Sequence, residues 1–120
     1  MTERDLMLVF SNPVDGQDEA YNEWYDRTHL AEIVAVPGVV SGRRYELAPL
    51  EIPGDEDHPA PPPPAHRYLA LYELDRDPDE VMAECGRRML TGEIGIHEAI
   101  DMSTISTTVW RPRVPRRPAP

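Results

Sequence analysis

The residues best suited to chemistry lie between positions 21 and 29, in a segment whose composition predicts a helix from about residue 15 to about residue 32. At helical spacing, five side chains form one stripe: Tyr21, Trp24, Tyr25, Thr28 and His29. A histidine that faces an apolar, aromatic surface titrates near neutral pH and is shielded from water, as cofactor-free proton transfer requires. A histidine near a helix end also suits a structural role, because it interacts with the helix dipole. The pattern leaves both roles open for His29.

A second group of candidates lies on the strand predicted over Val39–Leu47. Its alternation places Arg43 and Tyr45 on one face and Arg44 on the other. An arginine turned toward the aromatic stripe would bind a carboxylate or stabilise an enolate oxygen. Alternation does not decide which arginine faces inward, and we take Arg43, with Tyr45, as the candidate. A salt bridge on the surface or between subunits is the alternative role.

Three further residues are candidates for contacting a ligand. Tyr68 and Tyr72 share one face of the strand predicted over Tyr68–Leu74 and would line a cavity or a subunit interface. Asn12 follows the first strand and would bond a ligand carbonyl, although asparagine there is also typical of a turn. The histidines lack metal-ligand spacing, and the sequence has no glycine-rich nucleotide-binding loop. We therefore expect neither a metal nor a cofactor.

The elements that position these residues alternate in type along the chain. Apolar or alternating runs predict strands, and capped amphipathic segments predict helices. The expected order is strand Leu6–Phe10, helix 15–32, strand Val39–Leu47, strand Tyr68–Leu74, helix Pro78–Leu90 and strand Thr104–Trp110. A short helix near residues 97–100 is one interpretation of the segment before the last strand. This βαββαβ order predicts an α+β fold, the ferredoxin-like plait, with an antiparallel sheet and two helices on one face.

Proline placement divides the chain. Seven of the 14 prolines fall in residues 48–66, together with the acidic cluster at 55–57, which predicts a long solvent-exposed loop. Residues 111–120 combine prolines with four arginines and predict a disordered tail. We expect residues 1–110 to form a single domain that carries the proline-rich loop as an insertion, because a chain of 120 residues can bury one core.

Charge and composition exclude several classes of partner. A net charge of -10 disfavours binding to nucleic acid. No apolar run approaches the roughly 18 residues of a membrane span, and the N-terminal residues lack the apolar core of a signal peptide. The single cysteine, Cys85, excludes an intramolecular disulfide. We expect a cytoplasmic protein with no nucleic-acid or membrane partner.

The apolar pattern of two strands predicts a homodimer. Leu6–Phe10 is apolar at every position, and leucines occupy both faces of Tyr68–Leu74. Two helices cover only one face of a four-stranded sheet, so something else must cover the other face. In a chain this small, the simplest cover is a second copy whose sheet packs face to face with the first.

The run Tyr21…Trp24-Tyr25…His29-Leu30, followed by Pro37-Gly38 and Arg43-Arg44-Tyr45, resembles the EthD-like family of the dimeric α/β-barrel superfamily. The resemblance covers residues 6–45, and later segments match only in element order. It implies a ferredoxin-like protomer, a homodimer whose sheets close into a barrel, and a cavity between sheet and helices. The family's recurrent histidine on the first helix matches His29. Relatives include cofactor-free monooxygenases of polyketide pathways, muconolactone-type isomerases and polyketide cyclases.

These inferences together predict a cofactor-independent acid/base enzyme of the isomerase, cyclase, dehydratase or lyase type, with His29 as general acid/base. Its partner would be a small apolar molecule, an aromatic or polyketide-like carbonyl compound. A non-catalytic small-molecule-binding protein of the same fold and a cofactor-free monooxygenase are the alternatives. A structural subunit that acts through its proline-rich loop and arginine-rich tail is a further reading.

Overall fold

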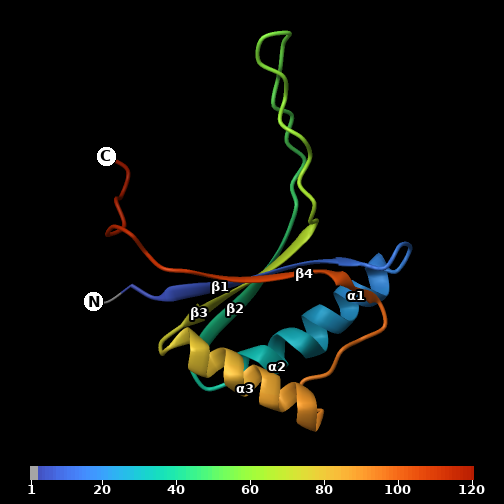
Figure 1. Ribbon diagram of the computed structural model, residues 1–120, viewed down its shortest axis with the longest axis vertical. Helices are drawn as coiled ribbons and strands as arrows, with labels where there is room; N and C mark the ends of the chain where they lie inside the picture. Colours follow the sequence, from blue (N-terminus) through green and yellow to red (C-terminus); the bar gives the residue numbers. More distant parts are fainter. Residues whose placement is uncertain (1–2) are drawn as a thin grey trace.

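The computed structural model describes residues 3–120 and has the βαββαβ order that the sequence predicts (Figure 1). One sheet contains the strands β1 (Asp5–Pro13), β2 (Val39–Glu46), β3 (Tyr68–Leu74) and β4 (Ile100–Trp110). Their order across the sheet is β2-β3-β1-β4, and every neighbouring pair is antiparallel. The fold is therefore α+β, a ferredoxin-like plait with an antiparallel sheet.

The helices lie together on one side of the sheet (Figure 1). They are α1 (Asp18–Trp24), a turn of π-helix, η1 (Tyr25–His29), and α2 (Leu30–Val34), which run on from one another, and the separate helix α3 (Pro78–Thr91). The side chain of Asp77 caps α3 by accepting a hydrogen bond from the Asp79 amide at 2.9 Å. Gly92 ends α3 with a φ of 81°, a conformation that glycine adopts without strain. The sequence predicts both ends of α3 from these two residues, Asp77 and Gly92.

Several boundaries differ from the sequence-based expectation: the first helix begins at Asp18 instead of near residue 15, and β1 and β4 are longer than expected. β1 continues to Pro13 instead of ending at Phe10, because an irregularity between Phe10 and Asn12 lets the strand go on pairing with the start of β4. β4 accordingly begins at Ile100. Residues 97–100 form no helix; they make a turn in which the Ile100 amide donates to the His97 carbonyl at 3.3 Å.

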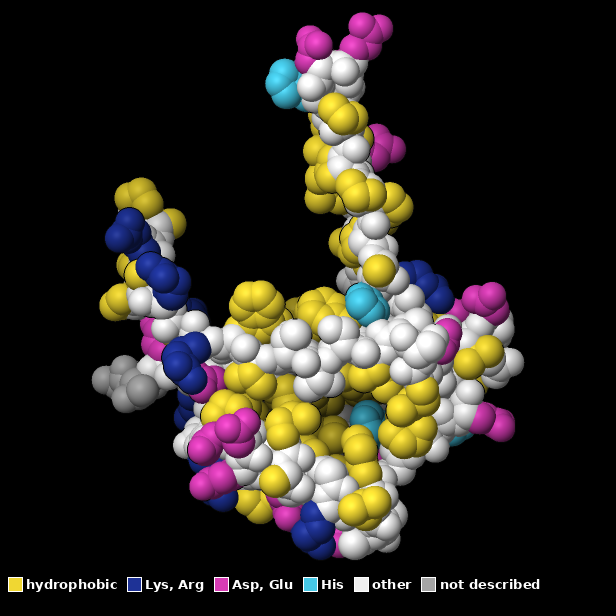
Figure 2. All heavy atoms as spheres, in the orientation of Figure 1, with side chains coloured by type: hydrophobic (Ala, Val, Ile, Leu, Met, Phe, Trp, Pro, Cys, Tyr) yellow, Lys and Arg dark blue, Asp and Glu magenta, His cyan; other side chains and the backbone are white. Residues whose placement is uncertain are grey.

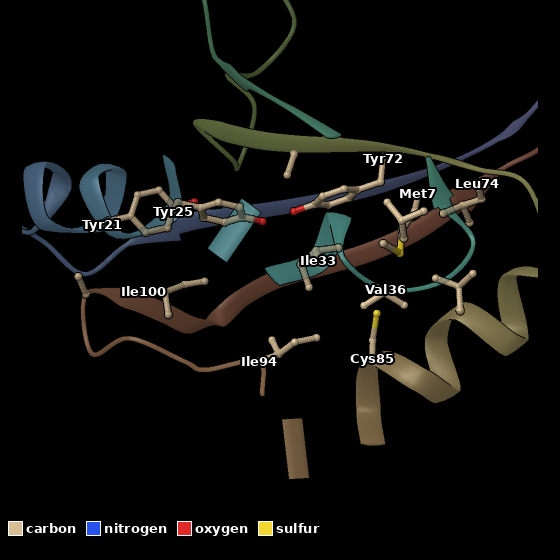
Figure 3. Close-up of a cluster of buried hydrophobic side chains, with 14 residues drawn as sticks. Met7, Tyr21, Tyr25, Ile33, Val36, Tyr72, Leu74, Cys85, Ile94 and Ile100 are labelled. Atoms are coloured by element: carbon tan, nitrogen blue, oxygen red, sulfur yellow. The ribbon is translucent and has the colours of Figure 1, made fainter. Parts of the chain in front are cut away.

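Strand alternation gives the sheet two different faces. Side chains that face the helices, among them Met7, Tyr72 and Leu74, form the buried core (Figure 3). On the opposite side, Leu8 pairs with Leu71 and lies in the same row as other apolar side chains. We call this side the open face; its large apolar residues are Leu6, Leu8, Phe10, Tyr45, Leu69, Leu71 and Trp110. No helix within residues 3–120 covers it (Figure 1).

Two irregular segments leave the sheet on its open-face side. Residues 47–67 form an arm between β2 and β3, and residues 111–120 form a tail after β4. Neither segment contains a helix or strand. Figure 1 shows the arm and the tail projecting away from the helices, at opposite ends of the sheet.

Candidate functional site

A turn of π-helix sets the position of His29. In η1 the helix is wider than an α-helix, so residues five apart come to lie over each other. The rings of Trp24 and His29 are stacked, with centroids 4.5 Å apart and planes 26° apart. Tyr25 meets the histidine ring edge-on, with centroids 4.9 Å apart. Thr28, which a regular helix would place on the same stripe, is exposed instead.

His29 is nearly enclosed, with 7% of its surface exposed. Its Nδ1 lies 3.3 Å from Oε1 of Glu32, three residues further along the helix. Because an ionised carboxylate only accepts hydrogen bonds, Nδ1 carries the proton and donates it, and Nε2 keeps a free lone pair. Burial lowers the pKa of His29, and the Glu32 carboxylate partly opposes this effect. The ring is therefore neutral at pH 7, in the form that accepts a proton.

Glu32 is itself held in place from a different part of the chain. Its two carboxylate oxygens lie 3.5 and 3.4 Å from the amide nitrogen of Gly95, in the segment between α3 and β4. His97, in the same segment, contacts Trp24 with ring centroids 5.6 Å apart. Sequence reasoning did not single out Glu32. Its position three residues after His29, on the same side of a helix, is the signal that could have found it.

Three tyrosines, Tyr21, Tyr25 and Tyr72, are buried in the core beneath the sheet (Figure 3). The hydroxyl of Tyr21 lies 2.5 Å from Oγ of Ser11, and the hydroxyls of Tyr25 and Tyr72 point toward each other. Among residues 3–120, the Tyr72 hydroxyl has no hydrogen-bond partner. Burial raises the pKa of all three phenols, that of Tyr25 to about 12. They stay protonated at neutral pH and supply walls and donors, not bases.

Arg44, and not Arg43, lies against Tyr21 and Tyr25. Its side chain is 10% exposed and its Nη1 donates to Oδ1 of Asp26 at 2.7 Å. Its guanidinium carbon lies 4.4 Å from the Tyr25 ring centroid, within cation–π range. Arg43 is on the open face, where its guanidinium lies over the Tyr45 ring at 5.6 Å. The structure thus places Arg43 and Tyr45 on the other side of the sheet from His29.

The remaining sequence candidates lie at the edge of the group. Tyr68 packs on Tyr21 with centroids 5.2 Å apart, and its hydroxyl donates to Oδ2 of Asp18 at 3.2 Å. Asn12 instead fastens the base of the arm. Its side-chain amide donates to the Ala65 carbonyl at 2.9 Å, and its side-chain oxygen accepts from the Arg67 amide at 2.8 Å.

A hollow opens between the sheet and the helices. Figure 2 shows it below β4, lined by hydrophobic side chains, with a histidine visible inside. On the helix-facing side of the sheet, Val9 of β1 and Ile105 of β4 pack against the core. The apolar lining of the hollow suits a small apolar ligand.

Other kinds of site find less support in residues 3–120. Within that range no group of three His, Cys, Asp or Glu side chains is arranged to hold a metal ion. None of the helices described there is both long enough and apolar enough to cross a membrane. Cys85 is a free thiol in the core, and burial raises its pKa, which keeps it protonated.

Comparison with known proteins supports the fold. No protein-family model matches the sequence, and no curated protein matches it either. Three chains of solved structures do match. One is the crystal structure of an ethyl tert-butyl ether d (EthD) family protein from Bacillus halodurans C-125, with a TM-score of 0.50 and 15% sequence identity. The match covers 92% of this chain and 98% of that one. This chain therefore has the fold of an EthD family protein, which confirms at the level of the fold the resemblance carried by the first helix.

Proposed function

We propose that this protein is a cofactor-independent acid/base enzyme with His29 as its general acid/base. Its substrate is a small apolar carbonyl compound, aromatic or polyketide-like, and its reaction is an isomerisation, cyclisation, dehydration or lyase step. The observation that carries the proposal is the setting of His29. The ring is nearly enclosed, stacked on Trp24 at 4.5 Å and oriented by Glu32 at 3.3 Å.

In this mechanism, Nε2 of His29 removes a proton from the carbon next to the substrate carbonyl, and the electron pair moves toward the carbonyl oxygen. The imidazolium that forms is stabilised by the Glu32 carboxylate at Nδ1. In an isomerisation, the imidazolium then returns a proton from Nε2 to the substrate, at the same carbon or at another atom, and while it is on the ring this proton exchanges with solvent. Trp24 and Tyr25 form the aromatic wall beside the ring. Arg44 acts at a distance, because its positive charge lowers the pKa of His29 and favours the base form.

We further propose that a second copy of the chain covers the open face. Trp110 and Tyr45 on that face are 58% and 43% exposed in the single chain. With the half-buried leucines beside them they form a contiguous apolar surface, a feature that marks sites of protein–protein contact. Two sheets packed through these faces would bury it on both protomers. Arg43 and Tyr45 would then be interface residues.

A binding protein without turnover is the second candidate. The observation that favours it is the small exposed fraction of His29, 7%, which leaves little of the ring open to a substrate. A binding protein would hold an apolar molecule in the hollow without any dependence on the protonation of His29. A cofactor-free monooxygenase of the same fold would instead consume O2 during turnover.

The test is exchange of α-protons in D2O, followed by NMR, on a panel of small aromatic and polyketide-like ketones. The wild type should exchange the α-proton of at least one compound, and His29→Gln should exchange it at least about 100-fold more slowly, the ordinary contribution of a general base. Thr28→Ala, a change at the exposed neighbouring position, is the matched control and should exchange normally. Folded His29→Gln protein with unchanged exchange would refute the assignment. Ligand retained by native mass spectrometry without any exchange would favour the binding protein.

A further inference from the structure

A groove runs between the tail and the end of the sheet. It has a volume of about 730 Å³. Its walls combine apolar and cationic side chains: Leu6, Trp110, Val114, Arg4, Arg111 and Arg116. Two acidic residues also border it: Glu3 accepts from the Arg116 amide at 2.8 Å, and Glu73 pairs with Arg4 at 3.3 Å. The groove therefore presents an exposed tryptophan beside Arg111 and Arg116, in a lining that holds three arginines and two glutamates.

The arm has the complementary chemistry. Residues 47–67 hold the run Pro61–Pro64, and their leucine and isoleucine side chains, Leu47, Leu50 and Ile52, are exposed. The four acidic residues of the arm, Glu51, Asp55, Glu56 and Asp57, are also exposed. Extended proline-rich segments bind aromatic-lined grooves, because they lose little conformational entropy on binding. An acidic, proline-rich arm thus matches a groove built of tryptophan and arginine.

The arm's own anchors direct it away from the groove of the same chain. His66 packs against Phe10 with ring centroids 5.4 Å apart, and its Nε2 lies 2.7 Å from the Thr104 carbonyl. These contacts, with those of Asn12, hold the base of the arm on the open-face side. Tyr68, the first residue of β3 after the arm, pairs with Ser11 near one end of β1. Leu6, which lines the groove, is near the other end of β1. Five residues of strand separate them by roughly 17 Å.

The length of the arm fits a neighbouring molecule. About ten residues lead out to its tip, a reach of roughly 30 Å when extended. Sheets packed face to face lie only about 10 Å apart. An arm that rises from the open face therefore extends past a second sheet packed on that face (Figure 1).

We infer that the proline-rich arm of one protomer docks in the tail groove of a second copy of this chain. The inference rests on the proposed dimer and goes beyond it by naming a reciprocal clasp. Because the arm and the groove are at opposite ends of the sheet, the clasp requires the two sets of strands to run in opposite directions. The acidic arm then meets the arginine-rich tail, and Pro61–Pro64 lie against Trp110 at the end of the open face, where the partner's arm and not its sheet covers that side chain.

Cross-linking of cysteine pairs tests the clasp in the full-length protein. The variant Pro62→Cys/Val114→Cys joins the arm to the groove, and Pro62→Cys/Thr91→Cys is the control, since Thr91 is exposed at the end of α3 on the helix side. Each is treated with a bis-maleimide reagent and run on a denaturing gel. The native Cys85 is buried and stays unreactive. Native mass spectrometry of each variant reports the assembly state beforehand.

We expect a dimer mass, and a covalent dimer at least tenfold more abundant in the arm–groove variant than in the control. A dimer mass with no excess of covalent dimer overturns the clasp and leaves the proposed dimer standing. A dimer mass with a cross-link inside one chain also overturns it, since the arm then occupies its own groove. A dimer in which Pro62→Cys alone cross-links arm to arm overturns the opposite strand directions. A monomer mass overturns the dimer and the clasp together.

Discussion

The pair formed by His29 and Glu32 makes a sharp prediction for the variant Glu32→Gln. Glutamine keeps the size and the hydrogen-bonding capacity of the side chain but removes its charge. In the wild type that charge, 3.3 Å from Nδ1, raises the pKa of His29 against the larger lowering effect of burial. Its removal leaves burial unopposed, so the pKa must fall further.

The size of the fall follows from the geometry. An opposite charge at hydrogen-bonding distance shifts a pKa by about one to three units. The Glu32 side chain is 22% exposed, and water screens its charge, so we expect a fall of about one unit, equivalent to about 1.4 kcal/mol. NMR titration of the histidine rings measures the shift directly. Comparison with His29→Gln identifies the His29 signal among the four histidines.

Glu23→Gln is the matched control for this experiment. It makes the same change of charge on the same helical segment, at an exposed residue paired with Arg27 at 3.8 Å. Its effect on the pKa of His29 should be below about 0.3 unit, because exposed charges at a distance are screened. An unchanged or raised pKa in Glu32→Gln, or equal shifts in both variants, would refute the proposed coupling.

Three further predictions concern stability. Tyr21→Phe should lower the free energy of unfolding by about 1–2 kcal/mol, because the buried Ser11 hydroxyl loses its hydrogen-bond partner. Tyr72→Phe should change the free energy of unfolding by less than about 0.5 kcal/mol, because the Tyr72 hydroxyl has no such partner among residues 3–120. Equal losses for the two variants in urea unfolding would contradict this prediction. Arg44→Met should destabilise the fold by about 1–3 kcal/mol, because it removes the ion pair with Asp26 and the contact with the Tyr25 ring. Arg27→Met, at an exposed position, should destabilise it by less than about 0.5 kcal/mol. A similar cost for both variants would be evidence against a stabilising contact between Arg44 and Tyr25. Burial lowers the pKa of His29 in the folded protein, so as the pH falls below about 6.5 the unfolded chain protonates this histidine first, and stability declines. His29→Gln should flatten that decline in thermal melts. An identical pH dependence of wild type and variant would contradict this prediction.

Much of the fold was readable from the sequence because its signals are local. Asp77 and Gly92 bracket α3 as their side-chain and backbone properties dictate. The fully apolar first strand pointed to a sheet with a second apolar face, and Leu8 does lie on the open face. The extension of β1 to Pro13 was missed, since it depends on pairing with residues almost 90 positions later in the chain.

The candidate site was readable only in part, because its geometry depends on departures from regular structure. Helical periodicity assumes 3.6 residues per turn, and the π-turn at Tyr25–His29 breaks that assumption. It moves Thr28 outward and brings His29 over Trp24. The choice between Arg43 and Arg44 depends on the irregular pairing between Val39 and Ser41 and on which face the helices cover. The alternation of side chains along a single strand reveals neither the irregular pairing nor the face that the helices cover.

The most direct test of His29 as the acid/base group compares two pH dependences. One is the rate of α-proton exchange of an active compound between pH 4 and pH 9, and the other is the NMR titration of the His29 ring. We predict that the rate rises about tenfold per pH unit and levels off at the pKa that NMR assigns to His29, which lies below the ordinary value of 6.5. A rate that is independent of pH, or that levels off at a different pKa, would contradict the assignment of His29.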